Sequence, residues 1–166
     1  SLTASMVKMK SEFTWENGRQ ITPVISLMDG NKTLKKGTDY IVVYPKESAD
    51  IGNYTVSITG KGNYTAVVSK GFRVFIPLGT TYTIKRLKYK VTGTSTVMLT
   101  GTSNKKISSL KVKNIVTIGG TEFRITAVGN KAFKGCKKLK NVSLGANIEK
   151  IGKNAFSGCK KLTTIK

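Results

Sequence analysis

The sequence contains no histidine, and its 166 residues include only eight carboxylates. Histidine is the commonest general base and the commonest metal ligand in proteins. The carboxylates form no close pair along the chain, so acid–base, catalytic-triad and metal chemistry have few residues to work with. We therefore expect neither an enzyme nor a bound metal or cofactor.

The sequence also has no long apolar run and no amphipathic helix of good length. Nowhere does it approach the about 20 apolar residues of a membrane-spanning helix. The opening residues, SLTASMVKMKSEF, lack the apolar core of a signal peptide. The 17 glycines, with abundant Thr, Val and Ile in short runs, indicate strands and turns. We expect a mainly β protein of one medium or two small domains, either cytosolic or cut from a longer exported chain.

Acidic residues are scarcest in the second half of the chain. Residues 1–76 carry 10 Lys and Arg against 6 Asp and Glu, a net charge of +4. Residues 77–166 carry 19 against 2, a net charge of +17. A surface of one sign concentrates anionic partners near it, although a solvated basic surface is the alternative interpretation.

Residues 1–76 show the pattern of short strands separated by turns. TPVISLMDGNKTL is a strand that runs into an Asp29-Gly30 turn, and DYIVVYP is a β-branched and aromatic run that ends at Pro45. In GNYTVSITGKGNYTAVVSKGFRVFI, apolar and polar residues alternate on both sides of a glycine-rich turn, as in half-buried strands. The pattern predicts a small β-sandwich, and the break at Pro77 and Gly79 places the domain boundary at residue 76.

This half resembles the immunoglobulin-like modules that occur in tandem along bacterial cell-surface proteins. The resemblance rests on ITPVISLMDGNKTLKKGTDYIVVY and GNYTVSITGKGNYTAVVSKGFRV. It implies a spacer or an adhesive unit without catalytic residues.

An eight-residue phrase occurs twice in the second half, as AFKGCKKL from Ala132 and as AFSGCKKL from Ala155. A shift of 23 residues aligns the two copies, and the matched positions around them are apolar or glycine. A repeat of this length that includes LKNVSL is the signature of a leucine-rich-repeat solenoid, in which each turn, or rung, stacks like residues on the next. We expect both phenylalanines to be buried and stacked. The predicted structural ladder consists of Phe133, Phe156, Cys136, Cys159, Leu139 and Leu162.

The repeated form I-x-x-[IV]-G-x-x-A-F-x-G-C-x-x-L-x-x-[VI] is similar to the BspA-like leucine-rich repeats of bacterial surface proteins. The resemblance covers residues 125–166 as two 23-residue repeats, the second incomplete. Residues 77–124 are expected to be flanking strands that cap the first repeat, with turns at Gly93, Gly101 and Gly119-Gly120. The resemblance implies a secreted or wall-anchored protein that attaches to host or neighbouring cells. With barely two repeats and no visible anchor motif, the chain is expected to be a monomeric fragment of such a protein.

The only cysteines, Cys136 and Cys159, share the repeat register. In an exported chain an even number of cysteines suggests a disulfide, and neighbouring rungs would place their Cα atoms about 5 Å apart, within disulfide range. Equivalent side chains in a ladder point the same way, however, and free cysteine behaves as a well-buried small hydrophobe. We expect two buried thiols, with a disulfide between rungs as the alternative.

Two lysine pairs also share this register, so stacking sets lysine above lysine twice. Two like charges about 5 Å apart repel by roughly 0.8 kcal/mol in water, which long side chains can relieve by splaying. These pairs form either a solvated edge or a docking strip for polyanions. The candidate residues for binding a polyanion or another partner are Lys137, Lys138, Lys160, Lys161, Lys140, Asn141 and Ser143.

The predicted function is non-enzymatic adhesion or display by a secreted or wall-attached bacterial surface protein that binds a protein or glycan of a host or neighbouring cell. The alternative is a module that binds a wall polymer, a sulfated glycan or a nucleic acid through the basic second domain. Tight binding that is little affected by salt would favour adhesion, and affinity that fades steeply with salt would favour polyanion binding.

Overall fold

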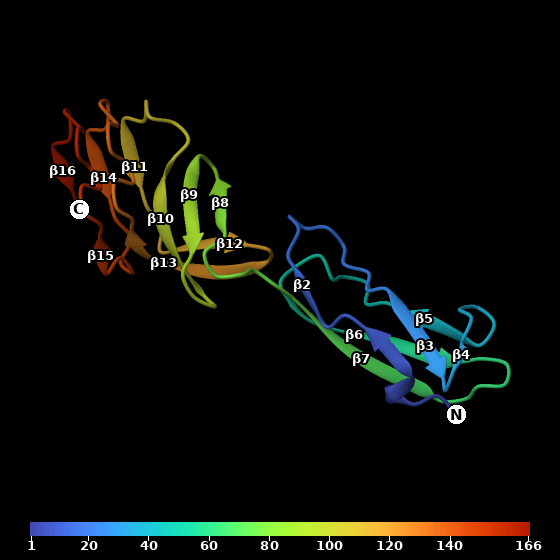
Figure 1. Ribbon diagram of the computed structural model, residues 1–166. Helices are drawn as coiled ribbons and strands as arrows, with labels where there is room; N and C mark the ends of the chain where they lie inside the picture. Colours follow the sequence, from blue (N-terminus) through green and yellow to red (C-terminus); the bar gives the residue numbers. More distant parts are fainter. The chain divides into compact units, whose positions relative to one another are not determined.

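The computed structural model describes all residues, 1–166, and the chain divides into two compact units, Ser1–Ile76 and Pro77–Lys166. Apart from one 3-10 turn, Ala4–Met6, every regular element is a strand (Figure 1). The prediction of a mainly β protein is confirmed. No helix in the structure is long or apolar enough to cross a bilayer.

The first unit contains two sheets that share an apolar core. The first sheet has the order β1-β3-β4, and the second has the order β2-β7-β6-β5. Val7 and Leu27 of the first sheet belong to one buried cluster with Tyr40 and Ile58 of the second. The strands are β1 (Val7–Met9), β2 (Glu12–Thr14), β3 (Ile25–Asp29), β4 (Lys32–Thr33), β5 (Tyr40–Val43), β6 (Gly52–Gly60) and β7 (Val67–Phe75).

The alternation of residue types in this unit predicts its burial correctly. Strand β6 buries Val56 and Ile58 and exposes Thr55 between its apolar residues, while β7 buries Phe72 and Val74. Antiparallel strands place successive side chains on opposite faces, so one face of each strand reaches the core. The Asp29-Gly30 turn joins β3 to β4, with Gly30 at a φ of 56°.

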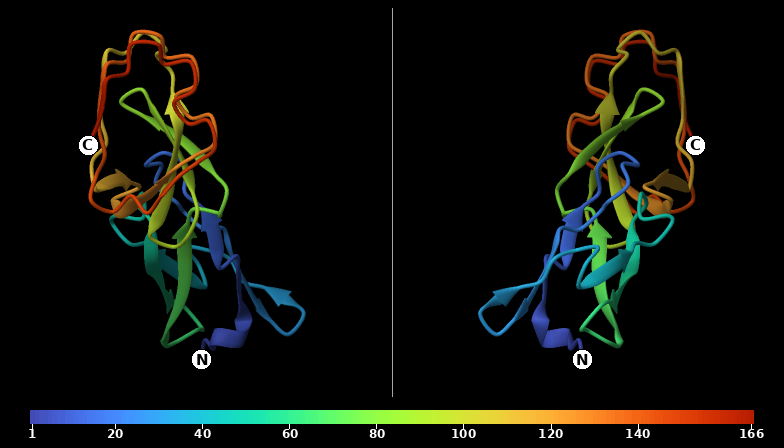
Figure 2. Two further views of the ribbon diagram at one scale, coloured as in Figure 1. Left: turned by 90° about the vertical axis from the view of Figure 1, so that its left-hand side faces the viewer. Right: turned by 90° about the vertical axis from the view of Figure 1, so that its right-hand side faces the viewer.

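The second unit is a short solenoid attached to an antiparallel sheet. Strands β10, β13 and β15 lie parallel in one ladder, and strands β11, β14 and β16 lie parallel in another. Viewed end-on in Figure 2, successive rungs follow nearly the same path. The strands are β8 (Thr81–Ile84), β9 (Leu87–Val91), β10 (Thr96–Thr102), β11 (Ser109–Lys111), β12 (Ile115–Ile118), β13 (Thr121–Val128), β14 (Asn141–Ser143), β15 (Lys150–Ile151) and β16 (Thr164–Ile165).

The second and third rungs stack at the spacing expected from the repeat. Val128 pairs with Ile151, and Val142 pairs with Ile165, each 23 residues apart. The backbone N–H of Phe133 donates to the carbonyl of Ala155 at 2.7 Å. The repeated residues therefore occupy equivalent places in neighbouring rungs.

The structure adds a first rung within the residues expected to form a cap. Strand β11 pairs in parallel with β14, so that Leu110 lies beside Val142, 32 residues away. Eighteen residues separate Leu110 from Val128, whereas nine separate Val142 from Ile151, because the β12–β13 hairpin is inserted in the first rung. Because of this insertion, the first rung does not follow the 23-residue spacing of the later rungs.

Gly101 does not mark a turn, contrary to expectation. It lies within β10, where the pairing with β9 shifts register between Leu99 and Gly101. Its φ is 153°, and an added Cβ would lie 2.8 Å from the carbonyl oxygen of Ala132. The glycine therefore forms a bulge that lets the second rung approach the strand closely.

The two repeat phenylalanines stack, but only one is buried. The rings of Phe133 and Phe156 lie 5.5 Å apart and are inclined by 8°. Phe133 is fully buried, whereas Phe156 is partly exposed, so the expectation that both are buried is wrong for Phe156. The same difference separates Leu139 from Leu162. The second rung lies between the first and the third, so its residues are covered on both sides. The third rung is covered by the second on one side only, which leaves its residues partly exposed.

Candidate functional site

Each predicted lysine pair occupies the centre of a tight turn. Leu139 N–H donates to the Cys136 carbonyl at 3.0 Å, and Leu162 N–H donates to the Cys159 carbonyl at 3.0 Å. The two lysines between these residues are exposed in both rungs. The flanking residues Cys136, Leu139 and Cys159 are buried and Leu162 is half-buried, so the central residues are directed to solvent.

The first rung contributes a third pair, Lys105-Lys106, that the 23-residue register does not reveal. It precedes Ser109 of β11 by four and three residues, as Lys137-Lys138 precedes Asn141 of β14. Lys160-Lys161 precedes Thr164 of β16 by the same number. The phrase NKKI, read against CKKL, is the sequence signal that could have identified it.

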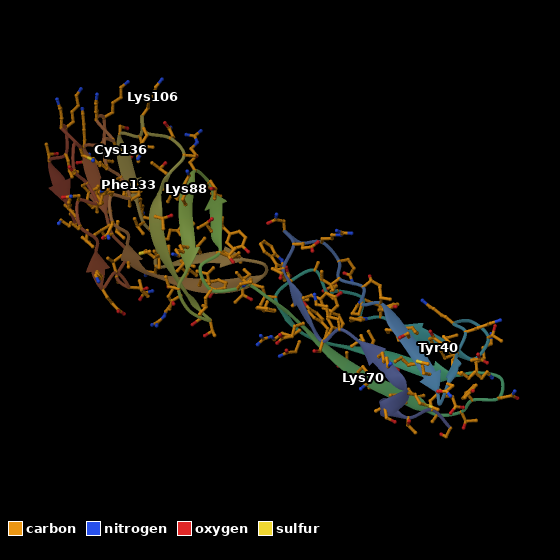
Figure 3. All side chains as sticks on the ribbon, viewed as in Figure 1. Tyr40, Lys70, Lys88, Lys106, Phe133 and Cys136 are labelled. Atoms are coloured by element: carbon orange, nitrogen blue, oxygen red, sulfur yellow. The ribbon has the colours of Figure 1, made fainter.

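These three pairs form one edge of the solenoid, which we call the lysine edge. In Figure 3 a row of nitrogen-tipped side chains continues from Lys106 along this edge. In the first rung the side-chain oxygen of Asn104 accepts from Lys106 N–H at 2.9 Å and holds the turn. The lysine edge consists of Lys105, Lys106, Lys137, Lys138, Lys160 and Lys161.

No carboxylate neutralises the lysine edge. The two ion pairs of the structure, Arg19–Glu16 and Arg73–Glu12, both lie in the first unit. Parallel strands lie about 4.8 Å apart, so each lysine backbone has a like neighbour at about that distance. Two charges 4 Å apart repel by about 1 kcal/mol in water, which is little enough for flexible stems to tolerate. Lys105 bends back, and its Nζ donates to the Lys134 carbonyl at 3.1 Å.

The other predicted binding residues lie on the parallel sheet β11-β14-β16. Asn141 and Ser143 are exposed at the two ends of β14, and the buried Val142 lies between them. Asn141 pairs with Ser109 and Thr164, and Ser143 pairs with Lys111. Lys140 is exposed between this face and the lysine edge, and its carbonyl accepts from Thr163 N–H at 2.9 Å. The predicted residues therefore divide between an edge of lysines and a polar sheet face.

The two cysteines lie in the core and form no disulfide. Both thiols are free and buried, and Cys159 Sγ donates to the Phe133 carbonyl at 3.2 Å. Burial raises the pKa of the Cys136 thiol, and the positive charge of Lys105 acts in the opposite direction. Burial also raises the pKa of Cys159. No group of three or more Cys, Asp or Glu residues is close enough together to hold a metal ion.

Residues 103–166 match the protein family described as BspA type leucine rich repeat region (6 copies). The match begins in the first rung, upstream of the repeats expected from residue 125. It confirms the predicted BspA-type repeats, and this family describes a repeat rather than an enzyme. No protein of curated function matches the chain. The immunoglobulin-like character of the first unit remains a prediction.

Three solved leucine-rich-repeat proteins are similar to part of the chain. The protein from Bacteroides ovatus ATCC 8483 is 25% identical with a TM-score of 0.48, over 51% of this chain and 23% of that one. The protein from Bacteroides capillosus ATCC 29799 is 24% identical with a TM-score of 0.48, over 52% and 64%. The Treponema protein described as T. pallidum leucine rich repeat protein is 30% identical with a TM-score of 0.44, over 52% and 39%. The chain thus spans less than two thirds of the length of each.

Proposed function

We propose that the chain is part of a non-enzymatic bacterial cell-surface protein whose repeat unit binds a protein or glycan on host or neighbouring cells. The surface location rests on the match of residues 103–166 to BspA-type repeats. The first unit acts as an immunoglobulin-like spacer, a role consistent with its two sheets around one core.

The observation that carries the proposal is the outward face of the sheet β11-β14-β16. It presents short polar side chains and two lysines on a backbone held in register across three rungs. Such a face offers hydrogen-bond donors and acceptors without needing to rearrange on binding, which lowers the entropic cost of association. The exposed residues of this face are Ser109, Lys111, Asn141, Ser143 and Lys166, with Thr164 half-buried.

The test measures adhesion of beads that display the full chain to cultured host cells and to bacterial cells at about 0.15 M salt, where the Debye length is about 8 Å. The variant Asn141→Tyr/Ser143→Tyr places two rings on the sheet face without changing the net charge, and we expect it to abolish adhesion. The control Thr83→Tyr/Thr117→Tyr alters exposed strand positions in the other sheet of the unit and should adhere normally. Equal adhesion by both variants would exclude this face as the binding surface.

A second candidate function is binding of an anionic polymer by the second unit. The specific observation in its favour is the lysine edge, where six exposed lysines from three rungs have no carboxylate partner. This function predicts affinity that decreases steeply with salt, because each contact releases counterions.

A further inference from the structure

We propose that the lysine edge binds a linear, densely sulfated glycan that lies along the axis of the solenoid, with about two anionic groups facing each rung. The proposal rests on the second candidate function and names the class of polymer. It does not depend on the sheet face β11-β14-β16, so the two binding activities can succeed or fail separately.

The lysine edge has a high linear density of positive charge. Each rung presents two lysines, and rungs repeat at about 4.8 Å, which gives one positive charge per about 2.4 Å along the axis. A sulfated glycan carries several sulfates and carboxylates on each disaccharide and can match this density. A polyol phosphate carries a single charge on each repeating unit and leaves lysines unpaired. The edge therefore favours the more densely charged polymer.

The cations of the lysine edge are of a single chemical type. All six residues are lysine, whose compact ammonium sits on a flexible stem, and none is arginine, whose planar fork suits bidentate phosphate recognition. Flexible point charges adapt to the irregular positions of sulfates along a sugar chain. The lysine edge thus suits a polymer with variable anion spacing.

The surroundings of the lysine edge disfavour base recognition. Proteins that hold single-stranded nucleic acid combine positive charge with aromatic side chains on which bases stack. In the second unit Tyr89, Phe123 and Phe133 are buried, and Tyr82 and Phe156 are half-buried. No exposed aromatic residue accompanies the lysines. Phosphates on each strand of a duplex are spaced by about 3.4 Å along the axis, which does not match the spacing of about 4.8 Å between rungs.

The backbone beneath the lysine edge is rigid. Three backbone hydrogen bonds, donated by Lys131, Phe133 and Gly135 to the third rung, fix the spacing of the second and third lysine pairs. The Lys105 Nζ bond to the Lys134 carbonyl links the first rung to the second near the lysines. The backbones that carry the lysines are therefore held at a fixed spacing before any ligand arrives, and binding incurs little ordering cost in the backbone.

The experiment measures affinity of the full chain for heparin as a function of salt, by calorimetry or surface plasmon resonance. The unmodified chain should give a slope of log affinity against log salt near −4, taking about 0.7 for each of six contacts as in single-stranded nucleic acids. The variant K105Q/K106Q/K137Q/K138Q/K160Q/K161Q should give a slope within about one unit of zero. Because K105Q removes a bond to Lys134, a second variant that retains Lys105 guards against loss of fold and should give a slope between these values.

A matched control removes the same charge elsewhere in the unit. The six exposed lysines for this control are Lys85, Lys88, Lys90, Lys113, Lys150 and Lys153, which lie outside both the lysine edge and the sheet face, and each is replaced by Gln. It should retain most of the slope of the unmodified chain. If the control loses as much heparin affinity as the lysine-edge variant, net charge alone binds the polymer and the proposed site is wrong.

Other polymers test the class of ligand. Polyglycerol phosphate, hyaluronan, oligo-dT and duplex DNA are compared with heparin at equal salt, and each should bind at least tenfold more weakly. Equal binding of polyglycerol phosphate would identify a wall polymer instead, and equal binding of either DNA would identify nucleic acid. Absence of heparin binding overturns the proposal, while adhesion that remains sensitive to Asn141→Tyr/Ser143→Tyr would leave the sheet-face function intact.

Discussion

Phe133 is fully buried because its rung lies between two others, whereas Phe156 in the third rung stacks on the Phe133 ring and is partly exposed. The residue type and the repeat position are identical, so the difference comes from neighbours alone. Truncating a buried aromatic leaves a cavity in proportion to the contacts it made. The two positions thus provide a matched pair of residues.

We expect Phe133→Ala to lower the free energy of unfolding by about 3–5 kcal/mol, and Phe156→Ala to lower it by roughly half as much. The first substitution empties an enclosed site, and the second leaves a hollow that water can enter. Urea unfolding of both variants measures the difference. Equal and small losses would show that the two rungs do not stack in solution.

The cysteines should behave as inert core residues. Burial raises the pKa of both thiols, so little of the reactive thiolate is present at neutral pH, and the sulfur atoms lie beneath the surface. Cys136 and Cys159 should resist a thiol reagent in the folded protein at pH 7. In denaturant both should react fully, as counted by mass spectrometry. A folded protein that yields no reactive thiol even in non-reducing denaturant would contain the disulfide that the structure lacks.

Strand β10 belongs both to the antiparallel sheet and to the first rung. It pairs with β9 on one side and with β13 on the other. The bulge at Gly101 lies where the strand passes from the antiparallel sheet into the first rung. The carbonyl oxygen of Ala132 occupies the position next to Gly101 where a side chain would begin. A strand residue with a side chain would block that approach.

We expect Gly101→Ala to lower the free energy of unfolding by about 1–3 kcal/mol, because its Cβ would contact the Ala132 carbonyl and its φ disfavours a side chain. Gly71→Ala in β7 is the control, since its Cβ would meet its nearest neighbour, the Tyr54 carbonyl, at an ordinary 3.8 Å. Thermal unfolding of the two variants should separate them clearly. A tolerated Gly101→Ala would contradict the close packing of the second rung on β10.

For the molecule as a whole, the dominant electrostatic property is a net charge of +21, of which +17 lies in residues 77–166. Charges of one sign destabilise a compact state by self-repulsion, and salt screens this repulsion. Stacking of the rungs concentrates lysines at one edge, so part of the repulsion is local to that edge. The cost is expected to persist until a polyanion or added salt reduces it.

The unmodified protein should therefore melt at a higher temperature when the salt concentration is raised from about 10 mM to about 500 mM, where the Debye length falls well below 10 Å. The six-glutamine variant of the lysine edge should melt higher than the unmodified protein at low salt, and the difference should shrink at high salt. Calorimetry of both proteins provides the measurement. A lysine-edge variant that is less stable at low salt would show that these side chains stabilise the fold through packing instead.

The sequence by itself determined the elements and the local register of this protein. Period-two alternation predicts which residues of β6 and β7 are buried, because side chains of a strand point alternately to its two faces. The 23-residue repeat predicts the stacking of the second rung on the third, because equivalent packing sites require like residues. Four of the six lysines of the lysine edge followed from that register.

Only the tertiary structure decided which residues occupy equivalent positions in neighbouring rungs when their separation along the sequence is not constant. Lys105 and Lys106 join the lysine edge at a spacing of 32 residues, because the β12–β13 hairpin lengthens the first rung without disturbing the ladder. The partial exposure of Phe156 and the bulge at Gly101 likewise depend on what lies against each residue in three dimensions. A solenoid aligns rungs by hydrogen bonding and packing rather than by residue count, so insertions alter the spacing and leave the surface continuous.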